Sequence, residues 1–305
     1  MTSTRLSPLL LLDERLCVRA TAGVRRVDLG APFEALIKKP GDDEFGEHNV
    51  IVTRIQLEDF RNKMLEEMAA HPELYHPKDV QRIRENDDLC RRYVRHKELD
   101  IPAALTWAKH SLRWRKQSGL NDATEEGFPI EFFNQGTLVP YNTDKFGSHV
   151  LTLRVKLHRK DSSMVDEMRK YLAFFMDKLM FEKDALRVTV VFDCTDAGVS
   201  NVDMELVKFV VTIFRDLYPW ALGYIIVHNM PWILNAVWKI VKTMLPSDGV
   251  QRVIFTSKES LLQYIDRRNL PKYMGGEDTY VYQYQKGNPL GDRCPRCTHP
   301  KVAIP

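Results

Sequence analysis

Apolar and polar positions repeat with a helical period over residues 51–120. From Val52 to Ala70, apolar residues recur every three or four positions among charged ones, which predicts an amphipathic helix. A second helical pattern runs from Pro77 to Lys97 and is interrupted near its middle by a pair of aspartates, which favour helix starts. A third ends at Gln117, shortly before a glycine. These patterns predict an N-terminal helical lobe.

After Gly127 the pattern changes to short β-branched runs that alternate with helical stretches. The predicted strands are 136–140 and 150–155, which form a hairpin, and then 187–192, 222–227 and 251–255. The predicted helices between and after them are 164–181, 203–217, 231–245 and 260–265. Strands that alternate with helices of this length indicate crossover connections in a largely parallel sheet. We therefore expect an α/β fold, in which residues 128–284 form a mostly parallel mixed sheet flanked by helices.

The most apolar part of the chain is the stretch from Leu222 to Leu245. A buried strand, a turn at Asn229 and Pro231, and a helix follow one another there without a spacer. At about 100° per residue, the apolar side chains of this helix cover an arc of roughly 200°, about twice what a core-facing surface helix needs. The arc contains Ile233, Leu234, Ala236, Val237, Trp238, Ile240, Val241, Met244 and Leu245.

Such a wide apolar arc has two explanations that periodicity does not separate. The helix is either buried on two sides in a large domain, or it has a second apolar partner such as a bilayer or a lipid-filled cavity. A transmembrane span is excluded, because His228, Lys239 and Lys242 interrupt the roughly 20 apolar residues that a span needs.

Composition narrows the function classes. The chain has 305 residues, 44% of them hydrophobic, which is enough for one large domain with a helical appendage. Its net charge of +3 gives no general attraction for nucleic acid, so we expect no nucleic-acid partner. Its five cysteines are scattered and odd in number, which is typical of a reducing compartment and predicts a cytoplasmic location without structural disulfides.

Motifs for common cofactors and reactions are absent from the sequence. It contains no GxGxxG, no GxxxxGK[ST] and no HExxH. Cys194 follows a predicted strand, but the loop after it carries no arginine to complete a phosphatase-type site, and Asp193 and Asp196 have the spacing of ordinary turn residues. Cys294 and Cys297 with His299 provide three ligands at most, against the four of a closed zinc site. We predict no catalytic residue and no metal or other cofactor.

The sequence also gives predictions for the two ends of the chain and for one group of basic residues. Residues 1–50 are predicted to be a disordered leader and residues 285–305 an exposed tail. The basic side chains near the second half are candidates for contact with anionic lipid, although solvated surface charge is the usual role of such residues. They are Lys239, Lys242, Arg267, Arg268 and Lys272.

Three segments in order resemble the CRAL-TRIO lipid-transfer family. They are YPWALGYIIVHNMPWILNAVWKIVK at Tyr218 to Lys242, VIFTSKESLLQYI at Val253 to Ile265, and NLPKYMGG at Asn269 to Gly276. The helical segment Arg91 to Lys116 resembles the N-terminal module of the same family. The resemblance covers about residues 51–284.

The resemblance implies a non-enzymatic protein that holds one lipid in a pocket between the sheet and a mobile gate helix, and exchanges it at membranes. The gate helix corresponds to residues 231–245. The implied pocket residues are Leu153, Val190, Phe192, Phe209, Ile213, Ile225, Val227, Ile233, Val237, Ile240, Val241 and Met244. The implied membrane-facing residues of the open gate are Leu234, Trp238 and Leu245.

The resemblance also bears on the ligand, the location and the main alternative. Phosphoinositide-binding members carry a basic pair in the lobe and a lysine after the last core strand, whereas the matching positions here are Lys97, Glu98 and Glu259, with Lys258 adjacent. An acidic residue repels phosphate, so we expect a less charged lipid. The expected partners are a hydrophobic lipid and, peripherally, intracellular membranes such as the endoplasmic reticulum; the sequence identifies no protein partner. The alternative is a non-transferring interaction scaffold or membrane-targeting module of the same fold.

Overall fold

The computed structural model describes residues 17–20, 23–26, 51–183, 185–245, 247–279 and 281–290. Four helices form the N-terminal lobe: α1 (Arg54–Ala70), α2 (Pro77–Glu85), α3 (Asp87–His96) and α4 (Ile101–Gln117). The break between α2 and α3 lies at Asn86, whose side chain accepts a hydrogen bond from the Leu89 amide at 2.8 Å and so caps α3. The predicted break is therefore confirmed to within one or two residues.

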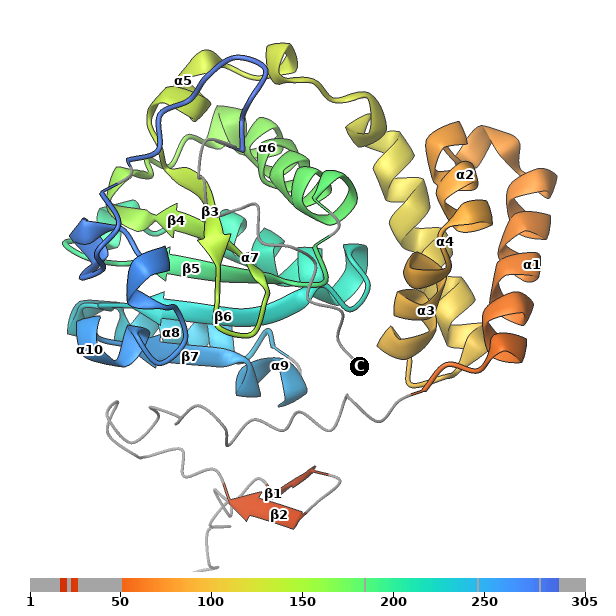
Figure 1. Ribbon diagram of the computed structural model, residues 1–305, viewed down its shortest axis with the longest axis horizontal. Helices are drawn as coiled ribbons and strands as arrows, with labels where there is room; N and C mark the ends of the chain where they lie inside the picture. The colour runs from red at the N-terminus through yellow and green to blue at the C-terminus, as the bar shows by residue number, and fades with distance from the viewer. Residues whose placement is uncertain are drawn as a thin grey trace, which may run out of the picture.

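Five strands form the central sheet in the order β3-β4-β5-β6-β7. Their bounds are β3 (Leu138–Thr143), β4 (His149–Arg154), β5 (Val188–Asp193), β6 (Leu222–His228) and β7 (Val253–Thr256). The first two strands are antiparallel and all later pairs are parallel, so the predicted α/β class with a mixed, mostly parallel sheet is confirmed. Figure 1 shows this sheet beside the helical lobe.

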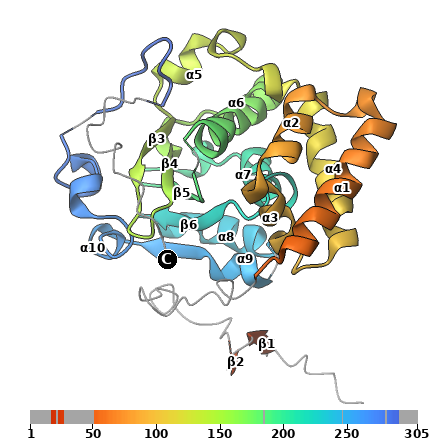
Figure 2. The same ribbon diagram turned by 45° about the vertical axis from the view of Figure 1, so that its right-hand side comes forward.

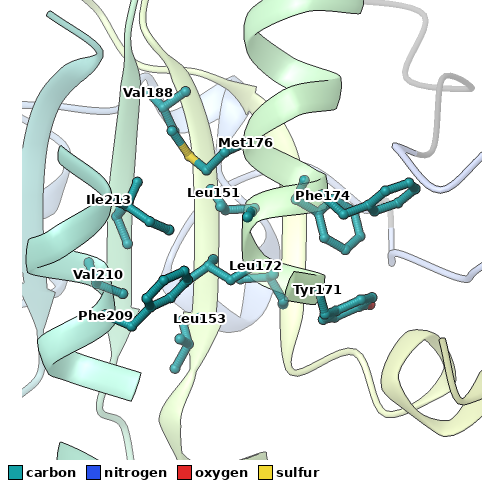
Figure 3. Close-up of a cluster of buried hydrophobic side chains, with 14 of the residues drawn as sticks. Leu151, Leu153, Tyr171, Leu172, Phe174, Met176, Val188, Phe209, Val210 and Ile213 are labelled. Atoms are coloured by element: carbon teal, nitrogen blue, oxygen red, sulfur yellow. The ribbon is translucent and has the colours of Figure 1, made fainter. Parts of the chain in front are cut away.

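The crossover helices all lie on one face of the sheet. They are α6 (Val165–Asp177), α7 (Met204–Thr212) and α8 (Asn235–Lys242). Because the parallel strands follow one another in chain order and such crossovers are right-handed, successive connections return on the same side. Leu151, Leu153, Val188 and Val190 on this face pack against α6 and α7, as Figure 3 shows for residues of both helices. The largest core of the protein therefore lies between the sheet and the crossover helices.

The other face of the sheet is covered by the segment that follows β7. Val150, Val191, Tyr224, Ile226 and Ile254 form a second core with side chains from this segment. The segment contains the helix α10 (Lys258–Leu261) and the 3₁₀ turns η12 (Arg267–Asn269) and η13 (Lys272–Met274). Successive residues of a strand point to opposite faces, which explains how both cores use the same strands.

Shorter elements connect these parts. They are the helices α5 (Ile130–Asn134) and α9 (Ser247–Gln251) and the 3₁₀ turns η3 (Pro72–Leu74), η4 (Leu120–Asp122), η5 (Glu125–Gly127), η6 (Val155–Leu157), η7 (Ser162–Met164), η9 (Val199–Asn201) and η11 (Trp232–Leu234). Because α9 occupies residues up to Gln251, β7 begins two residues later than the sequence predicts. In the first fifty residues the structure describes one antiparallel pair, β1 (Cys17–Ala20) and β2 (Gly23–Arg26), which the sequence did not predict.

The two long crossover helices end in wide turns. The predicted helix 164–181 is α6 followed by the π-helical turn η8 (Lys178–Glu182), and the predicted helix 203–217 is α7 followed by the π-helical turn η10 (Ile213–Leu217). The lobe packs against these turns. On α4, the indole N–H of Trp107 donates to the Arg215 carbonyl at 2.9 Å, and the Ser111 hydroxyl donates to the Leu217 carbonyl at 2.6 Å. Figure 2 shows the lobe beside α6 and α7.

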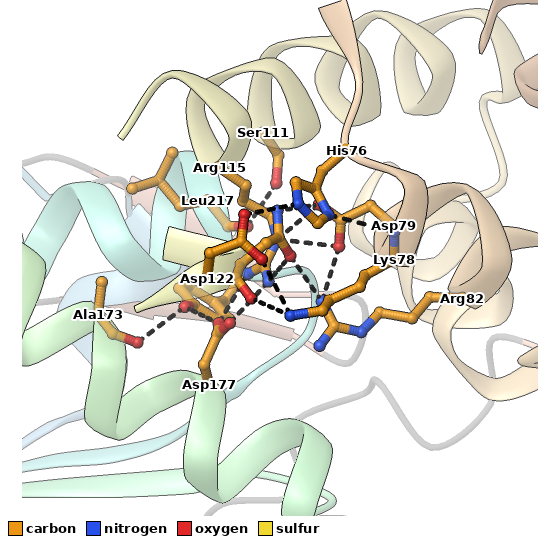
Figure 4. A network of polar contacts seen from close by, with 12 residues as sticks. His76, Lys78, Asp79, Arg82, Ser111, Arg115, Asp122, Ala173, Asp177 and Leu217 are labelled. Atoms are coloured by element: carbon orange, nitrogen blue, oxygen red, sulfur yellow. Dashed lines mark hydrogen bonds and ion pairs between the residues drawn. The ribbon is translucent and has the colours of Figure 1, made fainter. Parts of the chain in front are cut away.

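A buried polar network also joins the lobe to the sheet domain (Figure 4). Arg115 on α4 is 2% exposed, and its guanidinium donates to Asp177 at the end of α6 through two bonds of 2.7 Å. It also contacts Asp79 on α2 at 3.2 Å. The Tyr218 hydroxyl donates to Asp177 as well. Burial disfavours the charged guanidinium, but Asp177 and Asp79 outweigh that effect and hold the pKa of Arg115 above its ordinary value.

The structure describes residues 285–290 of the predicted exposed tail. Residues 285–287 are exposed there, whereas Tyr284, just before them, packs against α5. Tyr284 stacks on Phe133 with ring centroids 4.4 Å apart, and its hydroxyl donates to Glu125 at 2.6 Å. Pro289 is buried and Leu290 packs against the main core. Burial of apolar surface at Pro289 and Leu290, the aromatic contact of Tyr284 and its hydrogen bond to Glu125 explain why this segment is held in place.

Candidate lipid cavity beneath helix α8

An apolar cavity of about 110 Å³ lies between the sheet and α8. Its floor is made by β4 to β7, its wall by α7, and its roof by η11, α8 and the turn after α8. The lining side chains are almost entirely hydrocarbon. They include Leu153, Phe192, Ile225, Val227, Val253 and Phe255 from the sheet, Leu206, Val207, Val210 and Val211 from α7, and Leu234, Val237, Trp238, Val241 and Leu245 from the roof.

Half of the predicted pocket residues lie at this cavity. Leu153, Phe192, Ile225, Val227, Val237 and Val241 line it. Val190, Phe209 and Ile213 instead fill the main core between α7 and the sheet, so the cavity is confined to the side of β5 to β7 that α8 covers. Ile233, Ile240 and Met244 are not among the lining residues. The structure therefore places the cavity nearer to β7 than the sequence predicts.

The membrane-facing side was predicted for an open gate, and in this conformation its residues lie on the cavity side of the roof, so their contact with a membrane stays a prediction. Leu234, Trp238 and Leu245, predicted to face a membrane, line the cavity, and Trp238 packs edge-on against Phe255 with ring centroids 4.9 Å apart. Ile233 and Ile240, predicted to line the pocket, are 47% and 52% exposed. A 200° apolar arc does not say which of its edges faces inward.

The roof of the cavity is held by few buried contacts. None of the eight residues of α8 is buried, and Leu234 in η11 is the best covered roof residue at 4% exposure. Before the roof, Asn229 adopts a left-handed backbone with φ of 48°, and its amide N–H donates to the Thr256 carbonyl at 2.8 Å. Elements with few buried apolar contacts open at low free-energy cost. The roof is therefore the part of the cavity that is easiest to move.

A polar cluster that the sequence analysis missed lies at the edge of the cavity. His158 Nε2 and the Asp203 carboxylate are 3.1 Å apart, and both residues are buried. Asp203 also accepts hydrogen bonds from the first amides of α7, at 3.0 and 3.2 Å. Burial alone would raise the pKa of Asp203, but the His158 and backbone hydrogen bonds outweigh it and lower the pKa. The sequence contains one indication of this cluster, because an aspartate directly before a helix often caps it.

The catalytic candidates weighed from the sequence do not form a reactive arrangement. Cys194 is buried at the cavity, and burial raises the pKa of its thiol to about 12, so the nucleophilic thiolate is disfavoured at neutral pH. Asp193 points to the opposite face of the sheet from the cavity-lining Phe192. Asp196 lies on the surface, where it pairs with Lys156 at 3.0 Å. The two aspartates therefore do not form a carboxylate pair over the cavity.

The two headgroup candidates lie at opposite ends of the sheet. Lys97 follows α3, beside the turn that precedes β6, and its ammonium lies 5.5 Å from the centre of the Trp107 ring. Lys258 follows the carboxyl end of β7, which runs parallel to β6. One headgroup therefore does not contact both in this conformation. In the basic cluster, Arg268 pairs with Asp266 at 3.2 Å, which reduces its attraction for an anionic surface.

The described part of the chain contains neither a metal-binding cluster nor a helix that could span a membrane. Within it, no group of three or more His, Cys, Asp or Glu side chains is placed to hold a metal ion, and Cys294, Cys297 and His299 lie outside it. A search of the described helices finds none with the length and apolar character of a membrane span.

The sheet order and the cavity beneath α8 can be compared with known families. Residues 133–276 match the CRAL/TRIO domain family, the family that the sequence motifs resemble.

Named relatives refine the comparison. The chain is 28% identical over 211 residues to the phosphatidylinositol transfer protein CSR1 of Eremothecium gossypii, an alignment that covers 64% of this chain and 48% of the relative. It is 30% identical over 210 residues to the CRAL-TRIO domain-containing protein C3H8.02 of Schizosaccharomyces pombe, with 65% and 47% covered. The chain thus spans about half the length of these relatives. The solved structure of Sfh5 has the same fold, with a TM-score of 0.55 at 17% identity over 76% of this chain and 90% of that one.

Proposed function

We propose that this chain binds one lipid in the cavity beneath α8 and exchanges it at membranes. The observation that carries the proposal is the cavity itself, which is enclosed by hydrocarbon side chains and roofed by a helix without a single buried residue. An apolar interior favours acyl chains over water, and a weakly held roof provides a way in. Lipid binding in this form requires no catalytic residue and no cofactor.

The size of the cavity indicates that the roof must move for a lipid to enter. Its volume of about 110 Å³ is below the roughly 300–1,000 Å³ of ordinary small-molecule pockets. The aromatic side chain of Trp238 lines the cavity and packs on Phe255. We therefore expect α8 to swing outward and withdraw Trp238 when a lipid binds, so that the structure corresponds to the closed form.

Phosphatidylinositol is the first ligand to test. One relative is named a phosphatidylinositol transfer protein, and the relative SFH12 of Arabidopsis thaliana is named for phosphatidylinositol and phosphatidylcholine. The positions of Lys97 and Lys258 support a lipid without additional phosphates on its headgroup, because they do not form one basic site. The whole-length activity of those relatives is extended here only as a proposal.

The membrane partner is proposed from the outer side of the roof. Trp232 is 82% exposed, and Ile233 and Ile240 are about half exposed. Exposed apolar side chains at the mouth of an apolar cavity favour peripheral contact with a bilayer. We place the exchange at the cytoplasmic side of intracellular membranes. Within the family, the segment from His228 to Leu245 resembles motile sperm domain-containing protein 2, a likeness that a direct alignment would test.

Lipid extraction with a matched pair of variants tests the function. The purified protein is incubated with mixed-lipid vesicles and re-isolated, and its bound lipid is identified by mass spectrometry. Val237→Trp adds a large ring on the cavity side of α8 and is expected to reduce bound lipid at least tenfold, since overfilling an apolar site costs about 1–3 kcal/mol. Ile240→Trp makes a similar change on the exposed side and should retain lipid. A wild-type protein that returns empty from every lipid class would refute the proposal.

The second candidate is a scaffold of the same fold that no longer transfers lipid. The small cavity favours it, because Val190, Phe209 and Ile213 fill space next to α7 that a larger pocket would use. The same experiment separates the candidates: a scaffold gives no bound lipid in the wild type, and its behaviour is unchanged by Val237→Trp.

A further inference from the structure

The strand that leads into the roof ends in a fully buried histidine. His228 is the last residue of β6, is 0% exposed and lies one residue before Asn229, where the backbone turns toward η11 and α8. Its carbonyl accepts a hydrogen bond from the Cys194 amide at 2.9 Å. The histidine therefore lies at the base of the only covalent connection between the sheet and the start of the roof.

One ring nitrogen of this histidine has no partner. Nδ1 is hydrogen-bonded to the Thr256 hydroxyl at 3.1 Å, whereas Nε2 is buried and has no hydrogen-bond partner within the described part of the chain. In the neutral imidazole this arrangement leaves one ring nitrogen without a hydrogen bond but buries no charge. A protonated imidazole has two N–H donors and a charge, so its buried Nε2–H would need an acceptor that the described residues around it do not provide.

Two charged groups, Asp193 and Lys258, act on the ring from the face of the sheet opposite the cavity. The strand register aligns Arg154, Asp193, His228 and Thr256 in one row across β4 to β7. Lys258 on α10 is close enough to act on the ring, and Tyr273 on η13 covers Arg154 with 4.8 Å between the guanidinium carbon and the ring centre. Burial lowers the pKa of His228 below its ordinary value; Asp193 opposes this shift and Lys258 adds to it.

We propose that His228 is a proton-sensitive latch for the roof: protonation of its ring favours release of the hinge at Asn229 and outward movement of α8. The inference rests on the proposed lipid exchange, whose regulation it names. Release of the hinge lets Nε2–H reach water or the Asp193 carboxylate, which supplies the missing acceptor. The hinge is held by two bonds of Asn229, from its backbone N–H to the Thr256 carbonyl and from its side chain to the Thr195 hydroxyl.

The direction of the pH effect follows from where the proton is bound more tightly. In the closed form the pKa lies below the ordinary histidine value of about 6.5. The closed form is therefore favoured in full above that pH, and it loses this advantage as the pH falls below about 6.5, because the open form takes up the proton. One proton changes the open fraction by at most about tenfold between pH 7.5 and 5.5. Anionic membrane surfaces attract protons and would favour opening at the place of exchange.

Hydrogen exchange tests the latch without lipid. Amide exchange of residues 229–245 is measured at pH 7.5 and 5.5 and corrected for the intrinsic pH dependence of exchange. The wild type should show up to about tenfold more opening at the lower pH. His228→Asn, which keeps a partner for Thr256 but does not ionise in this range, should show no such increase. His149→Asn is the matched control, because His149 is a partly buried histidine with a lowered pKa at the other end of the sheet, and it should behave as the wild type.

Two results would overturn the latch. Equal roof exchange at both pH values in the wild type removes the effect itself, whether or not the variants fold. The same pH response in His228→Asn assigns the effect to another group. A parallel measurement of labelled phosphatidylinositol exchange between vesicles keeps the two proposals apart: a pH-dependent roof with no lipid exchange retains the latch and refutes the proposed function.

Discussion

At the scale of single residues, the two adjacent glycines of the motif LPKYMGG are each required for a different physical reason. Gly275 follows the turn η13 with a φ of 90°, a backbone angle that residues with a Cβ atom rarely adopt. Gly276 has ordinary backbone angles, but a Cβ atom built on it would lie 1.8 Å from the carbonyl oxygen of Leu270. One glycine is therefore needed for its backbone angle and the other for the close approach of two backbone segments. Both lie in the segment that covers the second face of the sheet.

Substitution of Gly276 tests the close approach. Gly276→Ala forces the backbone at Leu270 to move, since the clash is with main-chain atoms, and should lower the free energy of unfolding by about 1–3 kcal/mol or more. Gly127→Ala is the control, because its added Cβ meets no atom within 4 Å, and should change stability by less than about 0.5 kcal/mol. Urea unfolding measures both. Equal stability of the two variants would show that Leu270 moves freely.

At the scale of elements, the sequence predicted the order and type of the main helices and strands but not their ends. The β-branched runs at β5 and β6 were unambiguous because both faces of these strands are buried. The π-helical turns after α6 and α7 were not predicted, because their side chains continue the helical pattern of the sequence although the backbone forms a wider turn. Such turns are determined by tertiary contacts, which local pattern does not contain.

The candidate site was predictable to the same extent. The wide apolar arc of α8 indicated a second apolar partner, and the structure places a cavity on one side of the helix and exposed Trp232, Ile233 and Ile240 on another. Which edge of the arc faces inward depends on three-dimensional packing, which the sequence pattern does not contain. His158 and Asp203 were missed for a related reason: they are 45 residues apart, and only the fold brings them together.

The outer side of the roof gives a prediction for this element. The double variant Trp232→Asp/Ile240→Asp places charges on the exposed side and should weaken binding to phosphatidylinositol-containing vesicles by tenfold or more, since each large apolar side chain contributes about 1.5–3 kcal/mol when buried. Ile55→Asp on α1 is the control, because Ile55 is 81% exposed on the lobe, and should bind as the wild type. Vesicle co-sedimentation measures both. Unchanged binding of the double variant would remove this side of the roof from the membrane contact.

At the scale of the whole molecule, the lobe and the sheet domain depend on one another. The lobe supplies donors for carbonyls in the π-helical turn after α7, through Trp107 and Ser111. The helix α7 in turn forms one wall of the cavity through Val207 and Val211. Because the ends of α6 and α7 are both held by α4, the lobe fixes α7, which faces the cavity, and its neighbour α6, rather than serving as a separate appendage.

Arg115 is the residue on which this joint depends most. Arg115→Leu leaves Asp79, which is 1% exposed, and the mostly buried Asp177 without their shared cation. Removal of one partner of a buried ion pair costs about 3–5 kcal/mol. We expect a loss of this size in urea unfolding, together with faster amide exchange at the end of α7. Lys156→Ala breaks an exposed pair with Asp196 and should cost less than about 1 kcal/mol. A loss below about 1 kcal/mol for Arg115→Leu would mean that apolar packing alone joins the lobe to the sheet.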